Sequence, residues 1–156
     1  MPVPDLMLEH LHDAIRDVFK AMVFRDVQTL PARAERPAPA DGPCVVATVA
    51  FAGSRSGVVL FTSSADTARG IVGSMLNIPK HDVNGEVADG IGEIANLIAG
   101  SFRTRMAQSG PPWAISVPTV IIGSALETRF VANVSRASVP IEMQGERAYV
   151  DLVLNR

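Results

Sequence analysis

The chain has 156 residues, 47% of them hydrophobic, which is enough for one domain with a substantial core. Its formal net charge of -2 provides no long-range attraction for nucleic acid or for an anionic membrane surface. We therefore expect a single domain over residues 1–156, with no nucleic-acid partner and no membrane partner.

The sequence shows no pattern typical of export or membrane insertion. The longest apolar stretches, around residues 44–52 and 115–125, are well below the roughly 20 residues that a membrane-spanning helix needs. Residues 1–7 lack a basic region followed by an apolar run, and the single Cys44 cannot form an internal disulfide. These features favour a soluble protein in the reducing cytoplasm.

The first half of the chain predicts a helix followed by a hairpin. Apolar residues at helical spacing indicate a helix over residues 5–23, and a proline- and alanine-rich connector follows over 31–43. Residues 44–51 and 57–61 are rich in β-formers and are separated by a short glycine- and serine-containing turn. We expect these two segments to pair as antiparallel strands.

Two further helices are expected in the middle of the chain. Ser63, three residues before Asp66, is typical of a capping box, and the helix that it opens should end near Asn77. A longer helix is predicted over residues 84–108. Tandem prolines at 111–112 cannot continue its hydrogen-bond ladder.

Three β segments complete the chain. They cover residues 119–122, extending toward Val131, then 138–143 and 148–154. Read as consecutive neighbours, they form a β meander. The order of elements predicts an α+β fold with an antiparallel sheet, and a mixed sheet is the alternative.

The most informative segment is the helix around Glu93, which has two contrasting faces. At about 100° per residue, one side carries Asp89, Glu93, Asn96, Gly100 and Arg103. The other side carries Val87, Ile91, Ile94, Ile98 and Phe102. Glycines inside a helix cost about 1 kcal/mol each relative to alanine, so Gly90, Gly92 and Gly100 suggest close approach of a second backbone.

The polar face has chemistry suited to positioning a reaction. The Asn96 amide has two donors and one acceptor with which to orient a water molecule, and Glu93 can accept a proton, bind a metal or pair with a lysine. No nucleophile elbow, phosphate loop or paired metal ligand accompanies them, so we expect no metal site in this chain. Alternatively, Glu93 and Asn96 are ordinary solvated residues. Asp5, Glu9 and His12 repeat the same spacing, which is more typical of an exposed helix face.

The run Asp89-x-x-x-Glu93-x-x-Asn96, followed by Pro118, resembles the signature of the CheC/CheX/FliY chemotaxis phosphatases, and the CheX type most. Residues 57–61, 92–100 and 115–123 carry the rest of the resemblance. Pro118 lies about one residue closer to the asparagine than the family pattern places its proline.

The resemblance implies an α+β domain with a continuous antiparallel sheet packed by long helices. It implies that the substrate is a phosphorylated CheY-type response regulator, with Asn96 orienting the attacking water and Glu93 pairing with the regulator's lysine. The regulator would hold the Mg²⁺, and this chain would bind no cofactor. Further contacts with the regulator would come from Asp89, Gly92, Gly100 and Arg103.

The resemblance also implies a homodimer that forms through the sheets, with one site per chain because histidine occupies position 12. The competing interpretation is a homodimeric binding module that captures a response regulator or a flagellar motor-switch component without catalysis.

Overall fold

The computed structural model describes residues 2–37, 42–108, 110–130 and 133–156. The helical elements within these ranges are α1 (Asp5–Val18), the π-helical turn η1 (Phe19–Val23), α2 (Ala65–Leu76), the 3-10 turn η2 (Lys80–Asp82) and α3 (Val87–Met106). The predicted first helix is therefore confirmed, although its last turn widens into a π-helix. Phe24, which follows it, adopts a left-handed conformation with φ of 59°.

The strands form one sheet in which every described pairing is antiparallel. They are β1 (Gln28–Thr29), β2 (Pro43–Ala52), β3 (Ser56–Ser64), β4 (Ala114–Ile115), β5 (Thr119–Ser124), β6 (Val134–Met143) and β7 (Glu146–Asn155). Their order is β1-β6-β7-β3-β2, with β4 and β5 both paired to the remaining edge of β2. This arrangement confirms the α+β class and excludes the mixed sheet among the described strands.

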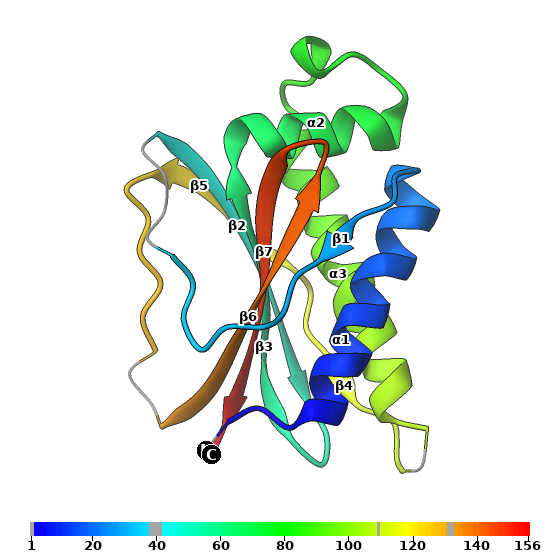
Figure 1. Ribbon diagram of the computed structural model, residues 1–156, viewed down its shortest axis with the longest axis vertical. Coiled ribbons are helices and arrows are strands. Elements are labelled where there is room, and N and C mark those ends of the chain that lie inside the picture. Colours follow the sequence, from blue (N-terminus) through cyan, green and yellow to red (C-terminus); the bar gives the residue numbers. More distant parts are fainter. Residues whose placement is uncertain (1, 38–41, 109, 131–132) are drawn as a thin grey trace.

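The helices pack on one face of the sheet, with α1 and α3 side by side and α2 across one end (Figure 1). The main core lies between these layers and includes Leu11 and Ile15 of α1, Ile94 and Ile98 of α3, and Phe61 of β3. Trp113 is buried and stacks on Phe51, with ring centroids 5.4 Å apart. Trp113 therefore belongs to this core.

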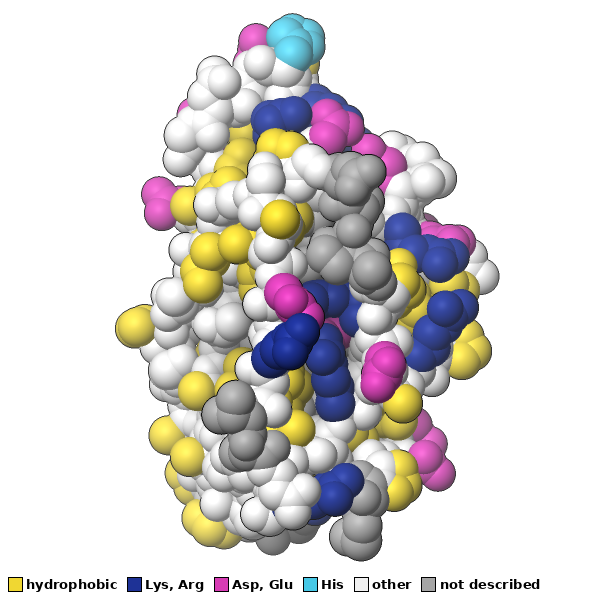
Figure 2. Space-filling model, turned by 90° about the vertical axis from the view of Figure 1, so that its left-hand side faces the viewer, with side chains coloured by type: hydrophobic (Ala, Val, Ile, Leu, Met, Phe, Trp, Pro, Cys, Tyr) yellow, Lys and Arg dark blue, Asp and Glu magenta, His cyan; other side chains and the backbone are white. Residues whose placement is uncertain are grey.

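The other face of the sheet holds a small apolar cluster and a buried ionic group. Val46, Leu60 and Val153 pack there against the segment that carries Leu126 and Phe130. Beside this cluster, the fully buried Asp151 accepts hydrogen bonds from Ser138 Oγ at 2.6 Å and Arg136 Nη2 at 2.5 Å, and lies 3.9 Å from Arg36. Lys and Arg side chains gather over the middle of this side of the molecule (Figure 2).

The predicted meander is wrong. β6 and β7 pair with each other, but β5 pairs with β2, so β5 and β6 lie toward opposite ends of the sheet although they are consecutive in the chain. The strand also ends at Ser124 rather than extending toward Val131, which lies outside the described residues. Ala125 turns the chain with φ of 56°, and the apolar side chains that follow pack across the outer face of the sheet.

Two local predictions also change. Ser64, not Ser63, caps α2, because β3 continues through Ser64 and its Oγ accepts a hydrogen bond from Thr67 N–H at 3.0 Å. The short strands β1 and β4 were not predicted, since two residues are too few to show a β period. The predicted end of α2 at Asn77 is confirmed, and this residue adopts the left-handed conformation that favours asparagine.

Candidate active surface on the third helix

The α3 helix presents the polar face that its spacing predicts. Asp89 and Glu93 are exposed, and Asn96, Gly100 and Arg103 are half-buried. On the opposite side, the five apolar residues Val87, Ile91, Ile94, Ile98 and Phe102 are buried in the core. The sheet and α1 therefore cover one side of the helix, and Glu93 and Asn96 lie on the side that is not buried in the core.

The Glu93 and Asn96 side chains are not engaged within the fold. Among the residues that the structure describes, none forms a hydrogen bond or ion pair with either side chain. Both groups retain their full capacity to bind an incoming molecule. A carboxylate and an amide one helical turn apart, on a helix held by a packed core, form a preorganised polar pair.

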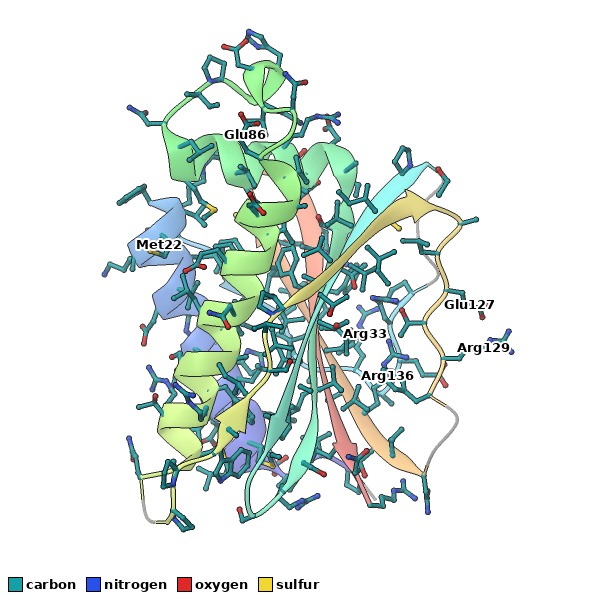
Figure 3. The ribbon with its side chains drawn as sticks, turned by 180° about the vertical axis from the view of Figure 1, so that it is seen from behind. Met22, Arg33, Glu86, Glu127, Arg129 and Arg136 are labelled. Carbon is teal, nitrogen blue, oxygen red and sulfur yellow. The ribbon has the colours of Figure 1, made fainter. Side chains whose placement is uncertain are left out.

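A groove of about 750 Å³ adjoins Asn96. Its walls come from the end of α1, from η1, from the second half of α3 and from β4. Asn96, Gly100 and Arg103 line it together with Met22 and Ile115. Met22 lies in η1, which continues α1 beside α3 (Figure 3). The amide thus opens into a concave, largely apolar surface rather than onto a flat helix.

The three glycines of α3 have different neighbours. A Cβ built on Gly90 would lie 2.5 Å from Val72 Cγ2 of α2. Gly92 is buried, and its Cβ would lie 3.2 Å from Val120 Cγ2. Packing inside the fold therefore accounts for both glycines, and a contact between Gly92 and a partner stays a prediction. Only Gly100 faces open space, since its Cβ would contact nothing within 4 Å.

The two arginines at the end of α3 have different environments. Arg105 forms ion pairs with Asp17 and, at 3.8 Å, with Asp13, so it joins α3 to α1. Of the described residues, none pairs with the Arg103 guanidinium. Arg103 therefore leaves a positive charge at the rim of the groove that remains available to a partner's carboxylate or phosphate.

The corresponding face of α1 has the same order of exposure, with His12 at the position that matches Asn96. His12 is half-buried, and its pKa is lowered, first by burial and then by the nearby positive charge of Arg16, while Asp13 partly opposes the shift. Asp5 and Glu9 are exposed beside it. A partly buried imidazole with a lowered pKa is predominantly neutral near pH 7.

The described residues contain no group of three or more His, Cys, Asp or Glu side chains arranged to hold a metal ion. No described helix has the length and apolarity to cross a membrane.

Comparison with known families shows the family of this chain. The model of the chemotaxis phosphatase CheX family matches residues 45–142, which is more than half of the chain. The chain belongs to the CheX family. The match spans Glu93, Asn96 and Pro118, the positions on which the resemblance in the sequence rests. No curated protein matches the chain in sequence.

Solved structures support the same fold. The chemotaxis protein CheX from Vibrio vulnificus is 23% identical with a TM-score of 0.82, covering 96% of this chain and 99% of that one. CheX in a complex with CheY, BeF3 and Mg²⁺ from Borrelia burgdorferi is 21% identical with a TM-score of 0.82, covering 96% and 97%. A CheC-like superfamily protein from Shewanella sp. PV-4 is 17% identical with a TM-score of 0.85, covering 99% and 100%. The CheX fold therefore extends over nearly the whole chain.

Sequence reasoning missed the apolar residues that surround the polar pair. Met22 belongs to the apolar pattern of the first helix, and Ile115 belongs to an apolar stretch. Both residues pack partly against the core and also line the groove beside Asn96. The exposed Val117 gave no signal, because a single valine before a proline is compatible with a core strand or a loop.

Proposed function

We propose that this CheX-family protein hydrolyses the aspartyl phosphate of a CheY-type response regulator, in chemotaxis or a related two-component pathway. The observation that carries the proposal is the outward-facing, unengaged pair Glu93 and Asn96 beside a groove on α3. These side chains occupy the glutamate and asparagine positions of the family signature. A solved CheX from Borrelia burgdorferi is itself in a complex with CheY.

In this mechanism Asn96 acts by positioning. Its amide holds a water molecule in line with the bond between phosphorus and the aspartyl oxygen. The water oxygen attacks phosphorus, the bond to the aspartate breaks, and inorganic phosphate and a free carboxylate remain. Amides do not act as bases at neutral pH, so the contribution of Asn96 is orientation rather than proton removal.

Glu93 binds the regulator rather than the phosphate. Its exposed carboxylate pairs with the lysine of the regulator's active site and sets the position of α3 over the phosphorylated aspartate. The Mg²⁺ that stabilises charge at the phosphoryl group belongs to the regulator in this proposal. Asp89, Gly100 and Arg103 complete the contact surface, and Gly92 lets α3 pack closely against Pro118 and Val120.

The first test measures the decay of a phosphorylated CheY-type regulator from the same organism. Wild-type protein should shorten the phosphoryl lifetime, and Asn96→Ala should reduce this acceleration by at least about 100-fold, because a positioned polar group is lost. Glu93→Ala should also lose most of the effect. Glu9→Ala is the matched control, since it removes an exposed carboxylate at the equivalent spacing on α1.

The same experiment tests the non-catalytic alternative. If wild-type protein binds the regulator and leaves its lifetime unchanged, the protein is a binding module and the catalytic assignment is wrong. If Glu9→Ala and Glu93→Ala lose the acceleration of phosphoryl decay equally, the contact surface includes both α1 and α3.

We also propose that the protein forms a homodimer through its sheet and acts in the cytoplasm. In the described residues, β5 pairs only with β2, so its outer edge has free backbone donors and acceptors. Such an edge favours pairing with a second chain. Sedimentation analysis that finds only monomer at micromolar concentration would exclude the dimer.

A further inference from the structure

Val117 is the most exposed of the large hydrophobic residues described, with 82% of its surface accessible. It lies in the short segment between β4 and β5, and it does not contribute to the core. Single exposed apolar residues are common, so exposure alone does not indicate a role. The position and rigidity of Val117 distinguish it.

Its neighbours in the chain place Val117 beside the candidate active surface. Ile115, two residues before it, lines the groove together with Asn96 and Gly100. Pro118, directly after it, lies under the helix, with Cγ 3.7 Å from a Cβ built on Gly92. The residues that flank Val117 therefore lie beside α3, with Pro118 near Gly92 and Ile115 near Asn96.

The backbone around Val117 is held to the sheet. Ser116 N–H donates to the Ala50 carbonyl at 2.8 Å, and Ala50 N–H donates to Ser116 Oγ at 2.9 Å. The Ser116 hydroxyl in turn donates to the Val117 carbonyl at 2.9 Å. Pro118 fixes its own φ and restricts the residue before it, and a β-branched side chain has few rotamers. The Val117 side chain is therefore conformationally restricted, and its two methyl groups are exposed to solvent.

Resting on the proposed function, we propose that Val117 is an apolar anchor that binds the phosphorylated response regulator next to Asn96. The partner surface is an apolar recess beside the regulator's phosphorylated aspartate. Ile115, two residues before the anchor, lines the groove beside Asn96, so one partner covers both the groove and the anchor. Because Val117 is already ordered, binding loses little side-chain entropy.

The test compares Val117→Thr, which keeps the shape and β-branching of the side chain, with Ile121→Thr. Ile121 is half exposed on β5 but pairs with Val46, whose side chain lies in the cluster on the outer face of the sheet, away from α3. Titration with the beryllofluoride-activated regulator and Mg²⁺ should give a Kd about tenfold higher for Val117→Thr, as expected for losing a buried apolar contact. Ile121→Thr should stay within about twofold. Sedimentation of each variant reports any change in assembly separately.

Kinetics separate an anchor from a residue that positions Asn96. Val117→Thr should raise the half-saturating regulator concentration by the same factor and leave the maximal decay rate unchanged, because the contact is equal in the ground and transition states. An unchanged Kd, or a lower maximal rate at unchanged Kd, would overturn the anchor.

Failure of the proposed function has a different signature. Wild-type protein that binds the activated regulator without speeding decay would disprove catalysis, and the titration of Val117→Thr would still decide the anchor. Wild-type protein that does not bind the activated regulator would disprove the anchor.

Discussion

Gly92 of α3 packs directly over Pro118 and Val120 of the β5 segment. A Cβ built on Gly92 would lie 3.7 Å from Pro118 Cγ and 3.2 Å from Val120 Cγ2, and the second distance is shorter than most real Cβ contacts. The glycine therefore lets the helix lie low against the sheet edge. Since Glu93 follows immediately and Asn96 lies one turn on, this contact sets the height of both side chains.

Gly92→Ala should therefore change activity more than stability. The helix gains about 1 kcal/mol of propensity and loses a similar amount to tighter packing, so we expect the free energy of unfolding to change by less than about 1 kcal/mol. A shift of α3 by a few tenths of an ångström should slow regulator dephosphorylation by about tenfold, because in-line attack depends on position. Urea unfolding and phosphoryl decay measure the two effects. An unchanged decay rate would contradict the role of this contact.

Gly100→Ala should stabilise the protein, because its Cβ meets nothing within 4 Å and alanine favours the helix. We expect about 1 kcal/mol, or a rise in Tm of roughly 2–4 °C. Gly90→Ala is the matched control and should destabilise by about 1–3 kcal/mol, because its Cβ would lie 2.5 Å from the stiff Val72 side chain. Thermal unfolding of both variants checks this. A fall in Tm for Gly100→Ala would mean that the fold itself requires this glycine.

The sequence predicted the exposed and buried sides of α3 correctly because helical periodicity is a local property. The apolar residues of α3 repeat at 3.6-residue spacing, so the sides occupied by Ile94 and Glu93 follow without knowledge of the rest of the fold. The hairpin of β2 and β3 was predicted for the same reason, since its turn and both strands are contiguous.

Relationships between distant segments were harder to predict. The place of β5 beside β2 depends on which sheet edges β6 and β7 leave free, and no local pattern encodes that choice. The glycines show the same limit: Gly90, Gly92 and Gly100 look equivalent in the sequence, yet each meets a different environment. The groove beside Asn96 could not be predicted from the sequence either, because η1 and β4, which form part of its wall, are separated from Asn96 in the chain.

Asp151→Asn should strongly destabilise the fold. The buried carboxylate accepts hydrogen bonds from Ser138 and Arg136, so its neutralisation leaves the Arg136 charge uncompensated. Breaking a buried pair in this way costs about 3–5 kcal/mol. Glu127→Gln is the control, since its pair with Arg129 is exposed and should contribute no more than about 0.5 kcal/mol. Chemical denaturation measures both. Similar values for the two variants would show that the outer face of the sheet tolerates loss of the ionic group.

His12 should make stability depend on pH. Its pKa in the folded protein is lowered from the ordinary value of 6.5, chiefly by burial and then by Arg16, so the fold favours the neutral imidazole. The contribution of neutral His12 to the free energy of unfolding is therefore fully present above about pH 6.5. It is lost as the pH falls through 6.5 toward the lower pKa of the folded state. His12→Gln removes the titrating group, and its stability should fall less than that of the wild type between about pH 7.5 and 5. Urea denaturation of both proteins across this range measures the difference. Parallel pH profiles would show that His12 protonates equally well in the folded and unfolded chains.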